Sequence, residues 1–464
     1  MKNLCAILCT ILMTSSLWAY DFEKDGLYYV ITCNINPYTV ALSYEFDESA
    51  DAPAYEGYKS VRIPSVVTYD SVQYTVTSIA NEAFYGCTTL KSVVIPKSIT
   101  HIGIDAFVGT ALYNNPSKWK NGILYIDNCL ISVDERFYGD CRIKDNTRVI
   151  ADGAFSYCKN LRSILLPQSL TTIDPAAFSY CESLTSITIP KGIQRIGDYT
   201  FDSCDSLTTV HLPNTIKSIG VLAFHACSAL TTLNLPSSLT SIGWNAWSDC
   251  SSLSSLTIPT NVTHIVGNAL DHTPIYHDPS NWKDDVLCVD GCLIDAKESI
   301  AGACIADDSI RLIADYAFGD CIKLTSVVIS DSVAHIGNHA WNGCYDLQAI
   351  SVSEGNPVYD SRENCNAIIE TATNTLVIGC SNSKIPPTVT SIGVEAFVHC
   401  KNLNSITIPK SVTYIDEGAF YDAFLSEINY EGTISEWNEV YLGFDWATNI
   451  HATYVQCIDG KVEL

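Results

Sequence analysis

The chain has 464 residues, of which 47% are hydrophobic and 17% are charged, and its 26 basic and 51 acidic residues give a formal net charge of −25. This composition is that of a folded protein and excludes an intrinsically disordered one. The acidic excess also argues against nucleic acid or an anionic membrane surface as the partner, because both carry negative charge.

Residues 1–19 are typical of an export signal. Lys2 supplies a positive start, residues 4–17 are largely apolar, and Ala19 is a small residue at a plausible cleavage point. The apolar run is shorter than the roughly 18 residues that a membrane span needs, and no later stretch reaches that length. We therefore expect an exported protein without a membrane span, extracellular or on the cell surface, with the periplasm as the alternative.

A 23-residue repeat dominates the chain after residue 75. Its most regular feature is a bulky residue, here called the anchor, that usually follows an alanine. Eight of the eleven intervals between anchors are 23 residues, and the other three are 48, 48 and 56. Such fixed self-similarity indicates a solenoid, in which each coil buries its apolar side against its neighbours. The anchors are Phe84, Phe107, Phe155, Phe178, Phe201, Phe224, Trp247, Leu270, Phe318, Trp341, Phe397 and Phe420.

Each coil is predicted to contain a short strand. In the coil of Phe201, the run from Leu184 to Ile189 alternates with period two, and Pro190 then ends the strand because it has no N–H to pair. An isoleucine stands five residues before all twelve anchors, as Ile196 does in this coil, which indicates a packing requirement. The glycine or aspartate that often follows favours a tight turn.

The three longer intervals are predicted to be hairpin insertions, at residues 108–143, 271–306 and 351–386. The first two are copies of each other, 163 residues apart. Each contains a run that predicts a β-hairpin arm followed by a return strand. Two interpretations stay open. The hairpins are binding protrusions, or they are variant coils whose tryptophans pack on the solenoid. The aromatic residues concerned are Tyr113 and Trp119 in the first copy and Tyr276 and Trp282 in the second.

The chain has 20 cysteines, and their positions favour buried thiols over the disulfides usual in exported proteins. Nine occupy one repeat position, three residues after an anchor, where a free cysteine packs as a small hydrophobe. The insertion cysteines are open between buried thiols, which we favour slightly, and the hairpin disulfides Cys129–Cys141, Cys292–Cys304 and Cys365–Cys380. The nine are Cys87, Cys158, Cys181, Cys204, Cys227, Cys250, Cys321, Cys344 and Cys400.

We find no pattern of residues that predicts catalysis, a cofactor or a metal. A cysteine spacing of 23 is the spacing of the repeat and not that of a zinc motif. No nucleophile elbow, phosphate-binding glycine loop or EF-hand loop occurs in the sequence. The sequence therefore predicts a protein that is not an enzyme and has no cofactor.

The strand face opposite the core is the natural contact surface of a solenoid. It is predicted to be a ladder of serine and threonine, nearly free of charge and of aromatic residues, with Thr188, His211 and Asn234 as its candidate contacts. Such a face lacks the tryptophan, tyrosine and arginine that usually dominate binding energy. A partner bound there makes broad polar contact or relies on the hairpins.

The full unit, from Leu184 through Cys204, resembles the leucine-rich repeat of the BspA-like proteins, also called the Treponema-type repeat. The resemblance implies a β-rich α/β solenoid: a right-handed superhelix of about 23-residue coils, with short strands and short helical turns, over residues 76–429. It also implies β caps at both ends, over residues 20–75 and 430–464. Caps are expected on physical grounds too, because an open end exposes apolar core and strand edges.

The resemblance also implies a bacterial surface or secreted protein with an adhesin-like, protein-binding role. Its partner would be a host matrix or surface protein. The first alternative is a carbohydrate-binding or periplasmic assembly protein that binds a glycan. A hydrolase is a remote alternative, because it would need an acid–base set converging in a cleft.

Overall fold

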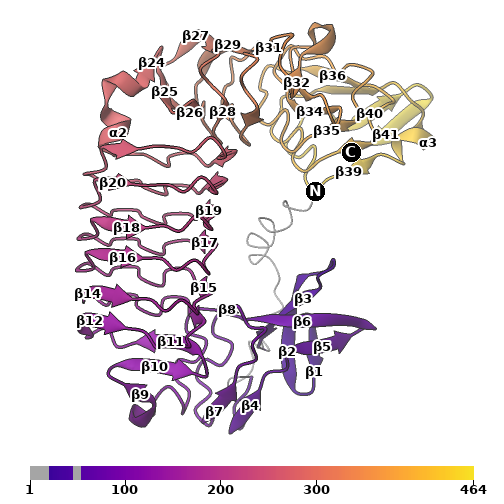
Figure 1. Ribbon diagram of the computed structural model, residues 1–464. Helices are drawn as coiled ribbons and strands as arrows, with labels where there is room; N and C mark the ends of the chain where they lie inside the picture. Colours follow the sequence, from indigo (N-terminus) through magenta and orange to yellow (C-terminus); the bar gives the residue numbers. More distant parts are fainter. Residues whose placement is uncertain (1–19, 45–53) are drawn as a thin grey trace. The chain divides into compact units, whose positions relative to one another are not determined.

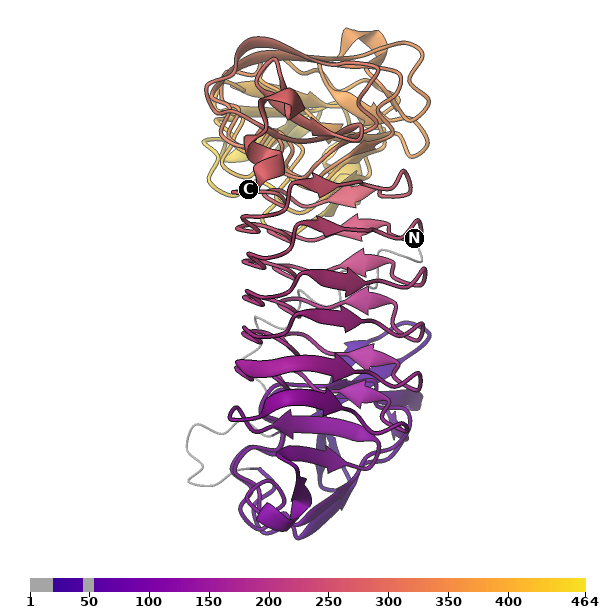
Figure 2. The ribbon, with the colours of Figure 1, turned by 60° about the vertical axis from the view of Figure 1, so that its left-hand side comes forward.

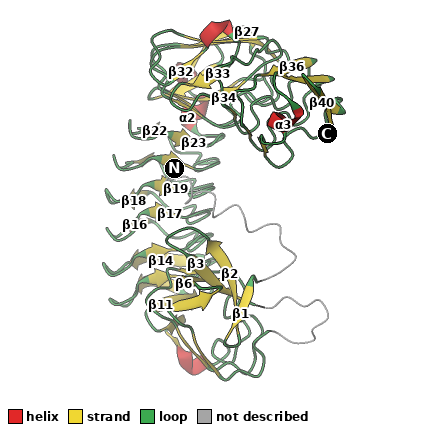
Figure 3. Ribbon diagram, turned by 90° about the vertical axis from the view of Figure 1, so that its right-hand side faces the viewer, coloured by secondary structure: helices red, strands yellow, loops and turns green. Residues whose placement is uncertain are grey.

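The computed structural model describes residues 20–44 and 54–464 (Figure 1), so the predicted export signal lies outside the described residues. Contacts divide the chain into two compact units. The first unit extends to Leu256 and includes Leu270–Ile275, and the second comprises Thr257–Ala269 and Tyr276–Leu464. Each unit is β-rich, and Figure 3 shows that helices are few and short.

A regular coil of the first unit contains two short parallel strands where the sequence predicted one. The first is the predicted strand, whose outer residues form the strand face. The second contains the isoleucine five residues before the anchor. Partners are 23 residues apart, Ile187 opposite Val210 in the first strand and Ile196 opposite Ile219 in the second. Figure 2 shows the strands stacked coil upon coil.

The strands of the strand face in the first unit are β4 (Ser60–Arg62), β7 (Ser92–Val94), β12 (Tyr138–Arg142), β14 (Asn160–Leu165), β16 (Ser186–Thr188), β18 (Thr209–His211), β20 (Thr232–Leu233) and β22 (Ser255–Leu256). The second strands are β8 (His101–Ile102), β13 (Val149–Ile150), β15 (Thr172–Ile173), β17 (Arg195–Ile196), β19 (Ser218–Ile219) and β21 (Ser241–Ile242).

The second unit repeats this arrangement. Its first strands are β27 (Ala301–Ala306), β29 (Lys323–Ile329), β31 (Ala349–Val352), β36 (Ser405–Ile408), β38 (Glu427–Tyr430) and β40 (Tyr454–Cys457). Its second strands are β23 (His264–Ile265), β28 (Leu312–Ile313), β30 (His335–Ile336), β35 (Ser391–Ile392), β37 (Tyr414–Ile415) and β39 (Tyr441–Leu442).

The eight residues from the Gly/Asp position to the cysteine, 197–204 in the coil of Phe201, are here called the turn segment. They form turns and not the short helical turns that the sequence predicted, because Tyr199 and Ser203 both have φ of 56°. The backbone N–H groups of Tyr199, Phe201 and Ser203 each donate a 2.8 Å hydrogen bond to a carbonyl of the next coil. We call this the turn ladder.

The helices lie outside the regular coils: η1 (Pro116–Lys118), α2 (Pro274–His277), η2 (Pro279–Asn281), η3 (Arg362–Asn364) and α3 (Ile434–Trp437). Three insertions supply hairpin strands: β9 (Trp119–Lys120), β10 (Ile123–Ile126) and β11 (Cys129–Val133) in the first, β24 (Trp282–Lys283), β25 (Val286–Val289) and β26 (Cys292–Ala296) in the second, and β32 (Tyr359–Asp360), β33 (Ile368–Glu370) and β34 (Thr375–Ile378) in the third.

Additional strands lie at both ends of the described chain. Strands within residues 22–43 and 66–79 form a sheet of order β1-β2-β3-β6-β5, in which β6 also pairs with β8. At the other end, β41 pairs antiparallel with β40. The strands not given above are β1 (Phe22–Lys24), β2 (Leu27–Cys33), β3 (Thr39–Ser43), β5 (Val66–Tyr69), β6 (Val72–Ile79) and β41 (Gly460–Glu463).

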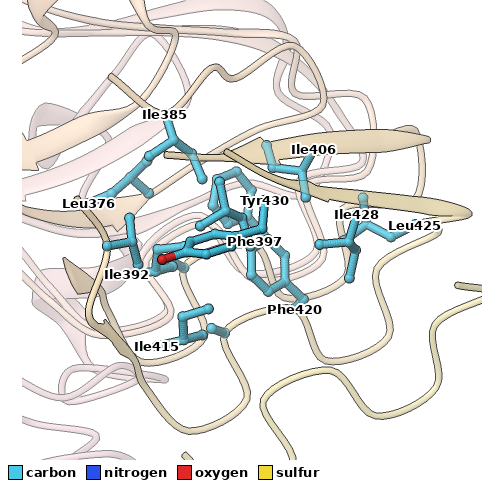
Figure 4. Close-up of a cluster of buried hydrophobic side chains, with 14 of the residues drawn as sticks. Leu376, Ile385, Ile392, Phe397, Ile406, Ile415, Phe420, Leu425, Ile428 and Tyr430 are labelled. Atoms are coloured by element: carbon cyan, nitrogen blue, oxygen red, sulfur yellow. The ribbon is translucent and has the colours of Figure 1, made fainter. Parts of the chain in front are cut away.

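The predicted anchors form the centre of the core. The rings of Phe178 and Phe201 stack at 5.5 Å between centroids, and those of Phe201 and Phe224 at 5.3 Å. In the second unit Phe397 and Phe420 stack at 5.0 Å, within the cluster shown in Figure 4. All twelve anchors are buried. The isoleucine five residues before the anchor, whose recurrence predicted a packing requirement, is buried in eleven of the twelve coils, and Ile336 is half-buried.

All eighteen cysteines among the described residues are free thiols, including those of the three insertions. In the regular coils the thiol also has a partner. The Sγ of Cys204 donates to the carbonyl of Phe178, one coil earlier, at 3.2 Å, and Cys227 donates to Phe201 at 3.1 Å. Burial raises the pKa of Cys158 to about 12. Seven of the nine cysteines of the expected ladder are buried, and Cys344 and Cys400 are half-buried.

We predict that the buried thiols do not react while the protein is folded, because a buried thiol with a raised pKa holds little of the nucleophilic thiolate at pH 8. Treatment with iodoacetamide at pH 8 should label Cys33, which is half-buried, and should leave Cys181, Cys204 and Cys227 unlabelled until denaturant is added. Peptide mass mapping reads the labelling. Rapid labelling of Cys204 in the native protein, or its recovery in a disulfide, would contradict the buried ladder.

Candidate functional site

The first insertion forms the predicted hairpin arm and return strand. Strand β11 pairs antiparallel with β10 and parallel with β13, so the hairpin extends the sheet of second strands. Strand β12 then pairs in parallel with β14 on the strand face. The insertion is thus a variant coil with an added arm.

The hairpin tryptophans are fixed in the same way in both copies. The Nε1 of Trp119 donates to the carbonyl of Tyr113 at 2.7 Å, and their rings meet edge to face at 5.2 Å. Trp282 and Tyr276 repeat this contact, with 2.6 Å and 5.3 Å. Both tryptophans are half-buried, so each packs on its own insertion and still offers part of its ring to solvent.

A cleft of about 950 Å³ opens beside the first insertion. It is lined by residues 102–108 of one regular coil, residues 131–136 of the insertion and residues 151–153, 156 and 157 of the next regular coil, together with Tyr113 and Trp119. We call it the insertion cleft. Its volume is in the range of ligand sites, roughly 300–1,000 Å³.

The lining of the cleft is rich in acidic groups. Asp105 and Glu135 are exposed, and Asp152 is half-buried. Asp134 is paired with Arg136, with Oδ1 to Nε at 3.0 Å and Oδ2 to Nη2 at 2.9 Å. These hydrogen bonds lower the pKa of Asp134 to about 2. The three other carboxylates are left to face a ligand, and they favour a cationic one.

A buried acid–histidine pair lies next to the cleft. Asp174, 3% exposed, accepts a 2.8 Å contact from Nδ1 of His101 and a 2.9 Å bond from the N–H of Ile102. Burial alone would lower the pKa of His101, but the hydrogen bond and charge of Asp174, with the charge of Asp152, outweigh it and raise that pKa. This pair links the coil of Phe107, before the first insertion, to the coil of Phe178, the second regular coil after it.

Asp152 is the acidic group of the cleft with the largest shift. Burial first, and then the charge of Asp174, raise its pKa to about 7. A carboxyl group whose pKa is higher in the folded state than in the unfolded state binds protons more readily when folded. Stability is therefore lost as the pH rises from about 4 to about 7.

We predict that Asp152→Asn removes this pH dependence. Near pH 8 the variant should be more stable than the parent by up to about 4 kcal/mol, because the ionised carboxylate is no longer held in an acidic, half-buried site. Near pH 4 the two proteins should have the same stability. Thermal unfolding from pH 4 to pH 8 measures the difference. Equal stability of the two at pH 8 would contradict the raised pKa.

The predicted strand-face contacts lie on the exposed side of the solenoid. Thr188 and His211 are paired in adjacent strands, and Asn234 follows β20 in the next coil. All three are exposed. The structure brings Tyr113 and Trp119 together at the insertion cleft, but it does not place the strand-face residues there. Tyr276 and Trp282 belong to the second unit.

Sequence reasoning missed the exposed aromatic residues of the turn segments. Tyr157, Tyr199 and Trp244 are 48%, 44% and 43% exposed, within three residues of their anchors. Tyr157 lines the insertion cleft and stacks on Tyr180 at 4.7 Å. The recurrence of aromatic residues close to the anchors was the signal for this surface. The sequence predicted contacts only on the strand face and on the hairpins, and it did not predict this surface.

Comparison with known proteins places the chain in a family. The model of the BspA type leucine rich repeat region, with six copies, matches residues 64–182, 148–276, 302–375 and 368–451. The chain therefore belongs to the BspA-type leucine-rich repeat proteins, as its repeat indicated. A search of curated proteins found no match.

Solved structures of bacterial leucine-rich repeat proteins are also similar. A leucine-rich cell surface protein of Faecalibacterium prausnitzii is 28% identical, over 92% of this chain and 98% of that one, with a TM-score of 0.31. A leucine-rich repeat protein of Bacteroides ovatus is 23% identical, over 95% and 100%, with a TM-score of 0.32. The leucine-rich repeat protein of T. pallidum is 24% identical, over 53% and 86%, with a TM-score of 0.26.

Two further features bear on the kind of site. Within residues 20–44 and 54–464, no helix is long and apolar enough to cross a membrane. In the same residues, no group of three or more histidine, cysteine or acidic side chains is arranged to hold a metal ion. Our candidate functional site is the insertion cleft, because aromatic and acidic side chains line it.

Proposed function

We propose that this chain is an exported, adhesin-like scaffold that binds a protein ligand at the insertion cleft and does not act by catalysis. The observation that carries the proposal is the cleft itself, which is lined by the half-buried Tyr113 and Trp119 and by carboxylates that have no ion-pair partner among the described residues. Binding energy in protein interfaces is concentrated in such aromatic residues. The exposed Tyr157 extends the same surface along the turn segments.

The family supports an interaction scaffold, and the repeat architecture supports the same role, because a solenoid presents a broad surface on a rigid frame. The ligand we propose is a host matrix or surface protein. A glycan is the second candidate, since the edge-to-face pair of Tyr113 and Trp119 offers an aromatic surface to a sugar ring. The proposed location is the cell exterior or surface.

The proposal is tested by binding the purified protein to immobilised host matrix proteins and to a glycan array. Trp119→Ala should weaken binding of the ligand by about 2 kcal/mol, roughly 30-fold, as is usual for a central aromatic contact. Asp105→Ala should weaken it less, because Asp105 is exposed. Circular dichroism of each variant checks that the fold is kept.

The matched control is the strand face. Thr188→Ala and His211→Ala should leave binding unchanged, because these residues lie outside the cleft. A loss of binding in these two variants, with Trp119→Ala unaffected, would place the ligand on the strand face. Binding of glycans alone would support the carbohydrate-binding alternative, and no ligand in either panel would contradict the adhesin-like role.

A further inference from the structure

The turn ladder is interrupted at the insertion cleft. In the first coil, the N–H groups of Glu82, Phe84 and Gly86 donate to carbonyls of the following coil at 2.8–2.9 Å. The corresponding N–H groups of that following coil belong to Asp105, Phe107 and Gly109. None of these three has a backbone partner among the described residues. The coil before the insertion therefore ends in a row of unpaired donors.

The coil of Phe155, on the other side of the cleft, lacks the matching bonds to its carbonyl groups. In the regular coils, carbonyls at three positions accept the ladder bonds from the coil before. Of the corresponding carbonyls in the coil of Phe155, only that of Ala154 is bonded, to the N–H of Val133 at 2.8 Å. Those of Asp152 and Ser156 have no partner within the described chain. Asp105, Phe107, Asp152 and Ser156 all line the insertion cleft.

Backbone N–H and C=O groups that are buried without a partner are rare in proteins. Phe107, whose N–H is one of these groups, is only 1% exposed. Each such group costs free energy unless water or a ligand satisfies it. The cleft, at about 950 Å³, is far larger than the roughly 30 Å³ that one water occupies in the liquid. It therefore has the donors, the acceptors and the room for one more segment of chain.

We propose that the insertion cleft binds a segment of a partner polypeptide that carries a basic side chain, and that this segment completes the interrupted turn ladder. Its carbonyls accept from the N–H groups of Asp105, Phe107 and Gly109, and its N–H groups donate to the carbonyls of Asp152 and Ser156. Its basic side chain meets the acidic lining. The inference rests on the proposed function, because it specifies how a protein ligand is held.

A polypeptide matches these features better than other ligands do. An anion would satisfy the N–H groups, but the carboxylates of Asp105, Glu135 and Asp152 repel it. A sugar offers hydroxyl groups but no regular alternation of donors and acceptors. A peptide backbone supplies both in sequence, as it does when a strand is added to a sheet edge. Charge complementarity then selects a lysine or arginine side chain.

The third insertion has the same backbone pairing as the first among the described residues, but it lies beside a smaller space. The N–H groups of His339, Trp341 and Gly343 again have no backbone partner among the described residues. The insertion's Gly379 occupies the position of an anchor and donates to the carbonyl of Ala396 at 2.8 Å. The space that remains is about 220 Å³, below the usual size of ligand sites. This pocket serves as an internal control.

The probe for the test is a nine-residue peptide that copies residues 196–204, the turn segment of a regular coil with the isoleucine before it, with both aspartates of the segment replaced by lysine and Cys204 by serine. Fluorescence anisotropy gives its Kd for the full chain. Hydrogen exchange should show protection of the amides of Asp105, Phe107 and Gly109 in the complex. The amides of His339, Trp341 and Gly343 should exchange as in the free protein.

Two sets of controls isolate the backbone and the charge. N-methylation of the peptide at the positions of Tyr199 and Ser203, whose N–H groups would face Asp152 and Ser156, should weaken binding at least tenfold. N-methylation at Thr200, whose N–H bonds within its own segment, should weaken it much less. Asp152→Asn should also weaken binding, while Asp198→Asn, at the same position of a regular coil, should not.

The outcomes separate this inference from the proposed function. Equal affinity of the N-methylated peptides, no binding of the probe, or protection only outside residues 105–109 would overturn the inference. If a matrix protein still bound and its binding depended on Trp119, the proposed function would stand although the inference was wrong. If a glycan bound at the cleft and prevented binding of the basic peptide probe, both the inference and the proposed protein ligand would be contradicted.

Discussion

Replacing Phe201 by alanine is expected to lower the free energy of unfolding by about 3–5 kcal/mol, because it removes a fully buried ring from the centre of the column. The ring contacts the anchors of both neighbouring coils, Phe178 at 5.5 Å and Phe224 at 5.3 Å. Coils are stabilised mainly by their nearest neighbours, so the cavity weakens two interfaces at once. Urea unfolding followed by circular dichroism measures the loss.

The matched control for this prediction lies two residues earlier in the same coil. Tyr199 is 44% exposed, and Tyr199→Ala should cost less than about 1 kcal/mol, as surface substitutions usually do. A loss below about 1 kcal/mol for Phe201→Ala would show that the column relaxes around the cavity and that stacking is not what holds the coils together.

The substitution Asp174→Gly is expected to cost about 3 kcal/mol, because it leaves a histidine and a buried N–H without their partner. Asp174 accepts from both His101 and the N–H of Ile102 across the first insertion. Glycine is the informative replacement, since Gly197 and Gly220 hold this position in the following coils. The backbone therefore accommodates it, and the loss reports the missing carboxylate.

Thermal unfolding of Asp174→Gly beside Asp174→Asn measures this effect. Asparagine keeps an acceptor for the N–H of Ile102, so it should recover part of the lost stability. The contribution of His101 to stability changes with pH in a definite direction. Its raised pKa means that this stability is present below about pH 6.5 and is lost as the pH rises through the folded-state pKa. Full stability in the glycine variant would contradict a structural role for the pair.

The insertions differ from the regular coils in what they leave unpaired. The coils of Phe178, Phe201 and Phe224 bond their turn-segment N–H groups to the next coil, whereas in the coil before the first insertion the unpaired N–H groups of Asp105 and Phe107 belong to residues that line a cleft. This is a physical reason for expecting recognition at an insertion. The strand face of the regular coils is poor in the aromatic residues that dominate binding.

The sequence by itself determined the repeat, the anchors and the thiol positions. These are properties of period: a residue that recurs every 23 positions occupies the same place in every coil, and such a place can be recognised without coordinates. The hairpins were equally visible, because strand alternation is a local pattern. The features that the sequence did not predict are local too. The second strand is only two residues long in most coils, and the turn segments depend on positive φ at residues such as Tyr199 and Ser203, which no propensity suggests.

Only the tertiary structure decided the site. His101 and His264 occupy matching positions in the two copies, yet their acidic partners come from different coils relative to the insertion, Asp174 in one and Asp315 in the other. The cleft itself depends on which N–H groups lack a partner in the next coil, and pairing between coils is a long-range property of the folded chain. Periodicity indicates where a residue lies within a coil, but the contacts across an interrupted stack follow from how the chain bridges the interruption.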